Sequence, residues 1–141
     1  MHPILRNGLG LLLGLIIGSI VNMSLILVSG KVIPPPAGAD VTTMEGLKAS
    51  MHLFGPQHFL FPFLAHALGT LAGAAVAARV AQTRKFALAM TVAGLFLVGG
   101  ISNVILLPSP VWFSAVDLLL AYLPMGWLAA RFLGGVPRAP A

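Results

Sequence analysis

Few side chains in this chain could carry proton chemistry, and two of them lie inside long apolar stretches. Asp117 is the only acidic residue within such a stretch, and His66 lies near the middle of another. A charge near the centre of a bilayer costs about 2.5–3.5 kcal/mol on insertion scales, so such groups usually face the bundle interior and pair. A carboxylate beside an imidazole stays ionised or shares a proton with it. We therefore expect His66 and Asp117 to form a proton-linked pair.

Two asparagines, Asn22 and Asn103, are expected at a similar depth. With the pair, they predict an outward-facing polar pocket in which the amides orient a ligand. Each asparagine also has a simpler interpretation, hydrogen bonding across helices. His66 also has a simpler interpretation, in which it donates a hydrogen bond to a backbone carbonyl left free by a kink at Pro62. Binding and structural roles both stay open at this point.

Other kinds of site find little support. His58 and His66 are separated by about 80° around a helix and about 12 Å along it, so with His52 they make a poor metal site. We expect no metal and no cofactor. The absence of cysteine excludes disulfide and thiolate chemistry. The chain contains no catalytic triad, phosphate loop or zinc-protease motif. Tyr122 and Trp127 are expected to fill core or interface positions.

Four apolar stretches must position these side chains, namely residues 7–28, 56–80, 86–107 and 111–133. Each holds about twenty residues or more, enough at a rise of 1.5 Å per residue to cross a hydrocarbon core of roughly 30 Å. In lipid each backbone polar group needs an internal partner, so each stretch must be a helix. We predict an all-α, polytopic membrane protein in which residues 1–141 form a single four-helix transmembrane domain.

Composition supports the same fold class, because 58% of the residues are hydrophobic and only 8% are charged. A water-soluble domain needs about a quarter of its residues charged. The eight lysines and arginines are scattered, which fits membrane orientation better than nucleic-acid binding. The lipid bilayer is therefore the expected partner, and no nucleic acid is.

The basic residues also predict an orientation. Six of the eight lie on the side of the expected bundle that holds the two termini: Arg6, Arg79, Arg84, Lys85, Arg131 and Arg138. The other side holds Lys31 and Lys48. Because cytoplasmic flanks carry the excess of basic residues, both termini are expected in the cytoplasm. The first apolar stretch is longer than a typical signal-peptide core and is expected to be a retained helix.

Small residues recur every fourth position on the first two predicted helices. The first carries Gly10, Gly14 and Gly18, and the second carries Gly69 and Gly73. Such spacing lets two backbones approach closely. It predicts a tight hairpin of these helices, and it is also compatible with one seam joining two copies in a homo-oligomer.

The connection between the first two spans, residues 31–55, is expected to carry a short amphipathic helix on the periplasmic side. Three prolines, 34–36, favour an extended chain before it. Thr42 and Glu45 predict a capping box. The apolar stripe of this helix, formed by Met44, Leu47, Met51 and Phe54, should lie on the membrane surface or fold over the bundle mouth. Residues 42–54 would then act as a lid.

A weak internal repeat relates the two halves of the chain. Residues 18–23 are similar to residues 99–104, and residues 77–80 to residues 129–132. Two hairpins related by an axis along the membrane normal would give this pattern. Chance alignment of apolar segments is the alternative.

Residues 32–40, 47–54 and 61–70 together resemble a group of small, uncharacterised bacterial four-helix integral membrane proteins. The resemblance covers most of the chain. It implies four spans in the bacterial inner (cytoplasmic) membrane, and it implies no activity.

Three functions remain open from the sequence. The chain could be an accessory or scaffold subunit of a larger membrane complex, for which the glycine seams offer docking surfaces. It could bind or transport a small or lipophilic ligand in the polar pocket. It could also be a membrane enzyme that uses His66 and Asp117 as acid and base.

Overall fold

The computed structural model describes residues 2–133, and every regular element in that range is helical. The long helices are α1 (Pro3–Val32), α3 (Leu60–Val80), α4 (Lys85–Leu106), α5 (Val111–Leu120) and α6 (Leu123–Phe132). Shorter elements are α2 (Met44–Ser50) and the 3-10 helices η1 (Met51–Leu53) and η2 (Pro56–Phe59). Four helical stretches are long and apolar enough to cross a membrane, which confirms the predicted all-α four-helix bundle.

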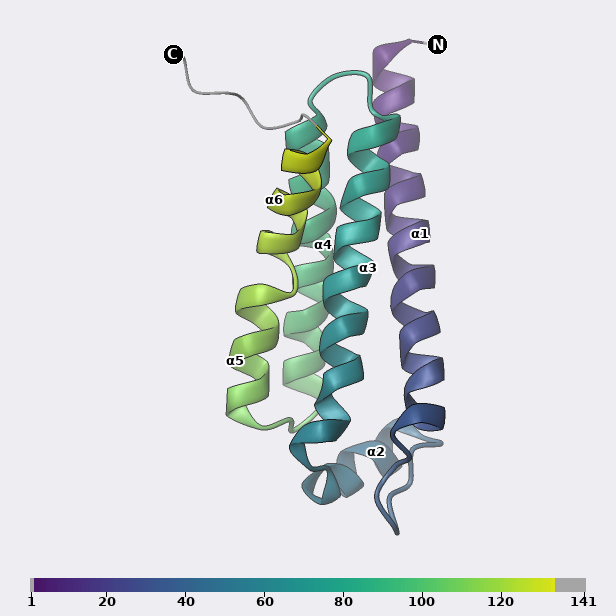
Figure 1. Ribbon diagram of the computed structural model, residues 1–141, viewed down its shortest axis with the longest axis vertical. Helices are drawn as coiled ribbons and strands as arrows, with labels where there is room; N and C mark the ends of the chain where they lie inside the picture. Colours follow the sequence, from purple (N-terminus) through teal and green to yellow (C-terminus); the bar gives the residue numbers. More distant parts are fainter. Residues whose placement is uncertain (1, 134–141) are drawn as a thin grey trace.

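Figure 1 shows the four spans side by side, with α3 at the centre of the bundle. Helix α3 packs against α1, α4 and α6. Helix α1 begins and α6 ends at the same end of the bundle, while α2 lies across the opposite end (Figure 1). We call this second end the α2 end. Arg138, one of the basic residues used to predict orientation, lies outside the described residues.

Helices α1 and α3 approach closely along the two glycine seams. A Cβ added at Gly14 would lie 2.5 Å from the carbonyl oxygen of Gly73, and one at Gly18 would lie 2.7 Å from that of Gly69. A Cβ at Gly10 would lie 3.0 Å from the carbonyl oxygen of Ala77. Any side chain at Gly14 or Gly18 would therefore push the helices apart. The seams face each other within one chain.

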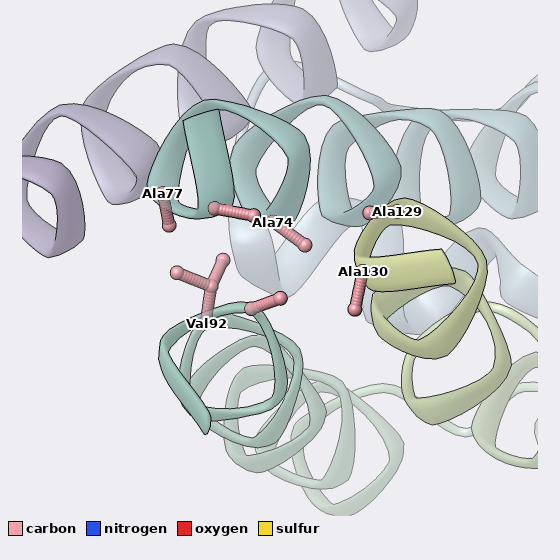
Figure 2. Packing of buried hydrophobic residues seen from close by; sticks show 7 residues of the cluster. Ala74, Ala77, Val92, Ala129 and Ala130 are labelled. Atoms are coloured by element: carbon pink, nitrogen blue, oxygen red, sulfur yellow. The ribbon is translucent and has the colours of Figure 1, made fainter. Parts of the chain in front are cut away.

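The rest of the core is made largely of alanine. Figure 2 shows Ala74 and Ala77 of α3 meeting Val92 of α4 and Ala129 and Ala130 of α6. Small side chains let three helices come close, which gives the dispersion contacts and weak Cα–H hydrogen bonds that hold membrane bundles together. The half of the bundle near the termini is therefore tightly packed.

The fourth span differs from the predicted continuous helix over residues 111–133. It divides into α5 and α6, and Tyr122 between them has φ −119° and ψ −82°, outside the helical region. Pro124 is the second residue of α6 and has no N–H to bond the carbonyl of Leu120. It also disfavours the helical conformation for Leu123 before it, so the helix breaks just ahead of Pro124.

The first span is longer than the predicted residues 7–28, because it starts at Pro3 and ends at Val32. A proline fits the first turn of a helix, where its missing N–H has no partner in any case. The helix ends where Ile33, the residue before the three prolines, becomes extended and donates its N–H to Ser29. At 1.5 Å per residue α1 is about 45 Å long, so it extends beyond a typical hydrocarbon core.

The predicted capping box of the loop helix is wrong by one residue. Thr43, not Thr42, is the N-cap of α2, and its hydroxyl accepts the N–H of Gly46 at 2.9 Å. Thr42 instead donates its backbone N–H and its hydroxyl to Oδ1 of Asp40, at 2.8 and 2.6 Å. These two hydrogen bonds are the main reasons why the pKa of Asp40 is lowered. They form an Asx turn that leads into the helix.

Candidate functional site

A buried ionisable pair lies between α3 and α5. Nδ1 of His66 is 2.8 Å from Oδ1 and 3.0 Å from Oδ2 of Asp117, which is only 2% exposed. The hydroxyl of Tyr122 donates to Oδ2 at 3.0 Å. An ionised carboxylate accepts hydrogen bonds and donates none, so it suits two donors. With Nδ1–H donating to Asp117, Nε2 is the nitrogen of His66 that is left to exchange a proton.

The break in the fourth span brings Tyr122 to this pair. In a continuous helix, five residues would place Tyr122 about 140° around the axis from Asp117, on a different face. Instead the tyrosine ring stacks on the imidazole of His66, with 5.7 Å between ring centroids. Gly100 of α4 makes room for it, because a Cβ at that position would collide with the tyrosine ring. Irregular backbone at membrane depth is tolerated where it is buried in protein or lines a cavity.

His66 borders a small chamber with a volume of about 260 Å³. Polar and small residues of α1, α3 and α4 form most of its wall, with two aromatic rings; the lining residues are Asn22, His66, Gly69, Thr70, Phe96, Gly99, Gly100, Asn103 and Tyr122. The amides, the hydroxyl and the imidazole offer both donors and acceptors. The chamber is therefore suited to a small polar group.

Thr70 provides an independent observation on this chamber. It is 1% exposed, yet within the described residues its hydroxyl has no hydrogen-bond partner. A buried polar group without a partner costs about 1–3 kcal/mol, and such groups are rare. Threonine hydroxyls in helices commonly bond to the carbonyl one turn back, but this one does not. Thr70 is also one of the residues that line the chamber.

A larger cavity of about 660 Å³ lies next to the chamber, towards the α2 end. The two spaces share Asn22, His66, Gly100 and Asn103 in their walls. Most of the larger wall is apolar, and α2 with the following turn contributes Met44, Leu47, Met51 and Phe54. Met51 packs against Phe59 and Phe113, so the loop helix is folded over the bundle mouth.

The structure thus brings together all four residues predicted to form a polar pocket. His66 and Asp117 are in contact, and Asn22 and Asn103 line both cavities. The two asparagines were predicted to lie at a similar depth, but they lie at different distances from the ends of their helices. Asn22 is ten residues before the end of α1, and Asn103 is three residues before the end of α4. Both residues nevertheless line the chamber.

The structural alternative for His66 rested on a kink at Pro62, and no such kink forms there. Pro62 lies in the first turn of α3, directly after η2, where a helix tolerates a missing N–H. The change of backbone geometry comes earlier, at the junction of η2 and α3. Nδ1 of His66 bonds to the carboxylate of Asp117.

His52, His58 and Trp127 have interactions of their own, and His58 also lines the larger cavity. Nδ1 of His52 bonds to the carbonyl of Ala49, and Nδ1 of His58 accepts the N–H of Gly55 at 3.0 Å. Among residues 2–133, no three metal-ligating side chains cluster. Trp127 is 41% exposed, and the guanidinium of Arg131 lies 5.2 Å from its ring centroid, as in an interfacial cation–π contact.

Sequence reasoning missed Tyr122 and Thr70 as members of the site. The signal for Tyr122 was Pro124, because a proline predicts a helix break at the residues before it. No signal in the sequence marked Thr70, whose importance follows from its burial and its unpaired hydroxyl. Phe96, Gly99 and Gly100 were also assigned no role in a cavity.

Fold and site together define a multi-pass, four-span membrane protein with a hydrogen-bonded His–Asp–Tyr group beside a two-part cavity. No family model, curated protein or solved structure matches the chain. The function is therefore inferred from the site.

Proposed function

We propose that this protein binds a small or lipophilic ligand in the two-part cavity at the α2 end. The observation that carries the proposal is that the ionisable pair faces an open space. His66 lines both cavities while it holds Asp117. A purely structural pair is best buried with its remaining polar atoms satisfied. Here an unpaired threonine hydroxyl and two amides converge on the same space.

The pair gives the site a means of coupling binding to a proton. As imidazolium and carboxylate the two side chains carry no net charge, whereas loss of the proton leaves one negative charge in an apolar setting. A ligand that donates or accepts a hydrogen bond at Nε2 of His66 would favour one of these states. Binding would then depend on pH, and replacing Asp117 by Asn would change that dependence because His66 would lose its carboxylate partner.

The proposed setting is the bacterial inner membrane, with both termini in the cytoplasm and the cavity on the periplasmic side. Arg6, Arg79, Arg84, Lys85 and Arg131 lie towards the end of the bundle where α1 begins and α6 ends. Lys31 and Lys48 lie towards the α2 end. This distribution supports the orientation through the excess of basic residues in cytoplasmic flanks.

The accessory role is less well supported. That role needs glycine seams that are free for docking, but within this chain the seams of α1 and α3 contact each other. The enzyme hypothesis needs a reacting group positioned against the pair, and no observation identifies one. Both remain outcomes of the test.

The test uses two matched glycine substitutions on α4. Gly99 lines the chamber and Gly94 lines neither cavity, and a Cβ at either position meets no atom within 4 Å. Gly99→Leu adds a bulky side chain at the exposed edge of the chamber, and Gly94→Leu adds the same side chain elsewhere on α4. The protein is extracted gently from membranes and its mass is measured under native conditions, with no ligand added.

A small molecule retained by the wild type and by Gly94→Leu, and lost from Gly99→Leu, would support ligand binding. Equal occupancy in both variants would contradict it, because the molecule would then lie elsewhere. A stable complex with other protein chains and no small molecule in any variant would favour the accessory role instead.

A further inference from the structure

We infer that the ligand is a lipid with a neutral, hydrogen-bonding head, which lies in the chamber while its apolar tail fills the cavity beneath α2. This inference rests on the proposed function and adds the chemical class of the ligand. It follows from three features of the cavity wall: continuity, charge and position.

Continuity comes from the shared wall of the two spaces. Asn22, His66, Gly100 and Asn103 border both, so the two spaces adjoin, and the inference places one molecule across both. Thr70 and the two asparagines line the chamber, so the polar end of the molecule would lie there. The larger cavity continues with side chains such as Ile26, Leu47 and Phe113. A ligand that matches this gradient has one polar end and one apolar end.

The charge of the wall indicates a neutral head. Within the described residues, no lysine, arginine or glutamate lines either cavity, and Nδ1 of His58 in the larger wall already accepts the N–H of Gly55. A phosphate or carboxylate head is normally held by arginine or lysine. The one carboxylate in these walls, Asp117, accepts hydrogen bonds from both His66 and Tyr122, so a cationic head is not needed to hold it. A carbonyl, amide or hydroxyl head fits the available donors and acceptors.

The position of the larger cavity indicates where the tail comes from. Met23 and Leu27 line it, and they are 54% and 69% exposed on α1, on a surface that faces lipid in a membrane protein. The cavity therefore has a border on the bilayer. Met44, at its other border, belongs to α2 and is 52% exposed. A lipid could enter between these borders without crossing water.

The experiment measures binding of four probes that share one oleyl chain and differ in the head. Oleyl alcohol and oleamide are neutral, oleyl sulfate is anionic, and oleylamine is cationic at pH 7.5. Acetamide serves as a probe with a head and no long tail. Each is titrated into the purified full-length protein in detergent, as wild type, Gly99→Leu and Gly94→Leu, with bound probe counted by native mass measurement.

The inference predicts that the neutral oleyl probes bind about tenfold or more tightly than the charged ones, a difference of about 1.4 kcal/mol. Acetamide should bind far more weakly than oleamide. Gly99→Leu should weaken the neutral probes by about tenfold, and Gly94→Leu should leave them unchanged.

Two kinds of failure can be told apart. If oleyl sulfate or oleylamine binds as tightly as oleyl alcohol and loses affinity in Gly99→Leu, the cavity is a ligand site but the neutral head is wrong. If acetamide binds as well as oleamide, the tail assignment is wrong. If no probe distinguishes Gly99→Leu from Gly94→Leu, both this inference and the proposed function are contradicted.

Discussion

Nδ1 of His66 lies 2.8 Å from Oδ1 of Asp117, although fifty-one residues separate the two along the chain. The contact joins α3 to α5 at a depth where each charge alone would be costly. The hydroxyl of Tyr122 donates a hydrogen bond to the carboxylate of Asp117. The imidazole of His66 lines the chamber and is accessible from it. Ligand binding is proposed because Asp117 is buried while its partner His66 is accessible from the cavities.

The first prediction concerns the hydroxyl of Tyr122. Tyr122→Phe removes a donor to Asp117 and should lower the free energy of unfolding by about 1.5–3 kcal/mol, the range for hydrogen bonds to charged groups. In an Asp117→Asn background the same change should cost less, since the acceptor is then uncharged. Reversible unfolding in mixed micelles measures both values. Equal losses in the two backgrounds would show that the hydroxyl does not act on this carboxylate.

The second prediction concerns Thr70. Thr70→Val keeps the shape and removes the unpaired hydroxyl, so the ligand-free protein should unfold with an unchanged free energy or become more stable by about 1–3 kcal/mol. Binding of oleamide, by contrast, should weaken. Thr91→Val on α4 is the control, because the hydroxyl of Thr91 bonds to the carbonyl of Ala87 and lines neither cavity. A Thr70→Val protein that is clearly less stable without ligand would mean that the hydroxyl has an internal partner.

The third prediction concerns the α1–α3 seam. Gly14→Ala would place a Cβ 2.5 Å from a backbone oxygen of α3 and should destabilise the protein by about 1–3 kcal/mol. Gly8→Ala on the same helix meets no atom within 4 Å and should be neutral or slightly stabilising, because alanine favours a helix by up to about 1 kcal/mol over glycine. Similar effects of the two substitutions on thermal unfolding would contradict the close approach.

The fourth prediction is a pH dependence in the loop before α2. Hydrogen bonds from the hydroxyl and backbone N–H of Thr42 lower the pKa of Asp40 below 3.8. A lowered carboxyl pKa stabilises the turn above pH 3.8, and this contribution is lost as the pH falls through the lowered pKa. Hydrogen exchange at the amide of Thr42 should therefore lose protection below about pH 3.8, after correction for the intrinsic rate. Asp40→Asn should show no such step, and a step that persists in this variant would assign it to another group.

The four spans were predictable because length and apolar composition leave a bilayer-embedded backbone no other structure. The His66–Asp117 pair was predictable for a related reason, since isolated charges in the spans are costly. The site beyond the pair was harder. Tyr122 reaches Asp117 only through the break ahead of Pro124, and a helical-wheel argument places it on another face.

Cavities and caps depend on details that residue spacing does not fix. Whether Thr42 or Thr43 caps α2 depends on Asp40, which binds Thr42 and leaves Thr43 to accept the N–H of Gly46. The space beside Thr70 depends on how far α4 stands from α1 and α3, a distance set by packing of the whole bundle. The predicted internal repeat stays a prediction. Asn22 and Asn103, its matched residues, do line one chamber, but the fourth span is broken where α3 is continuous.

The most direct measurement is an experimental density map of the wild-type protein, extracted gently and purified without added ligand. The account predicts continuous non-protein density that starts within hydrogen-bond distance of the Thr70 hydroxyl, passes His66 and extends beneath α2. Density for separate water molecules alone, or a chamber filled by neighbouring side chains, would contradict the central claim that this bundle holds a ligand.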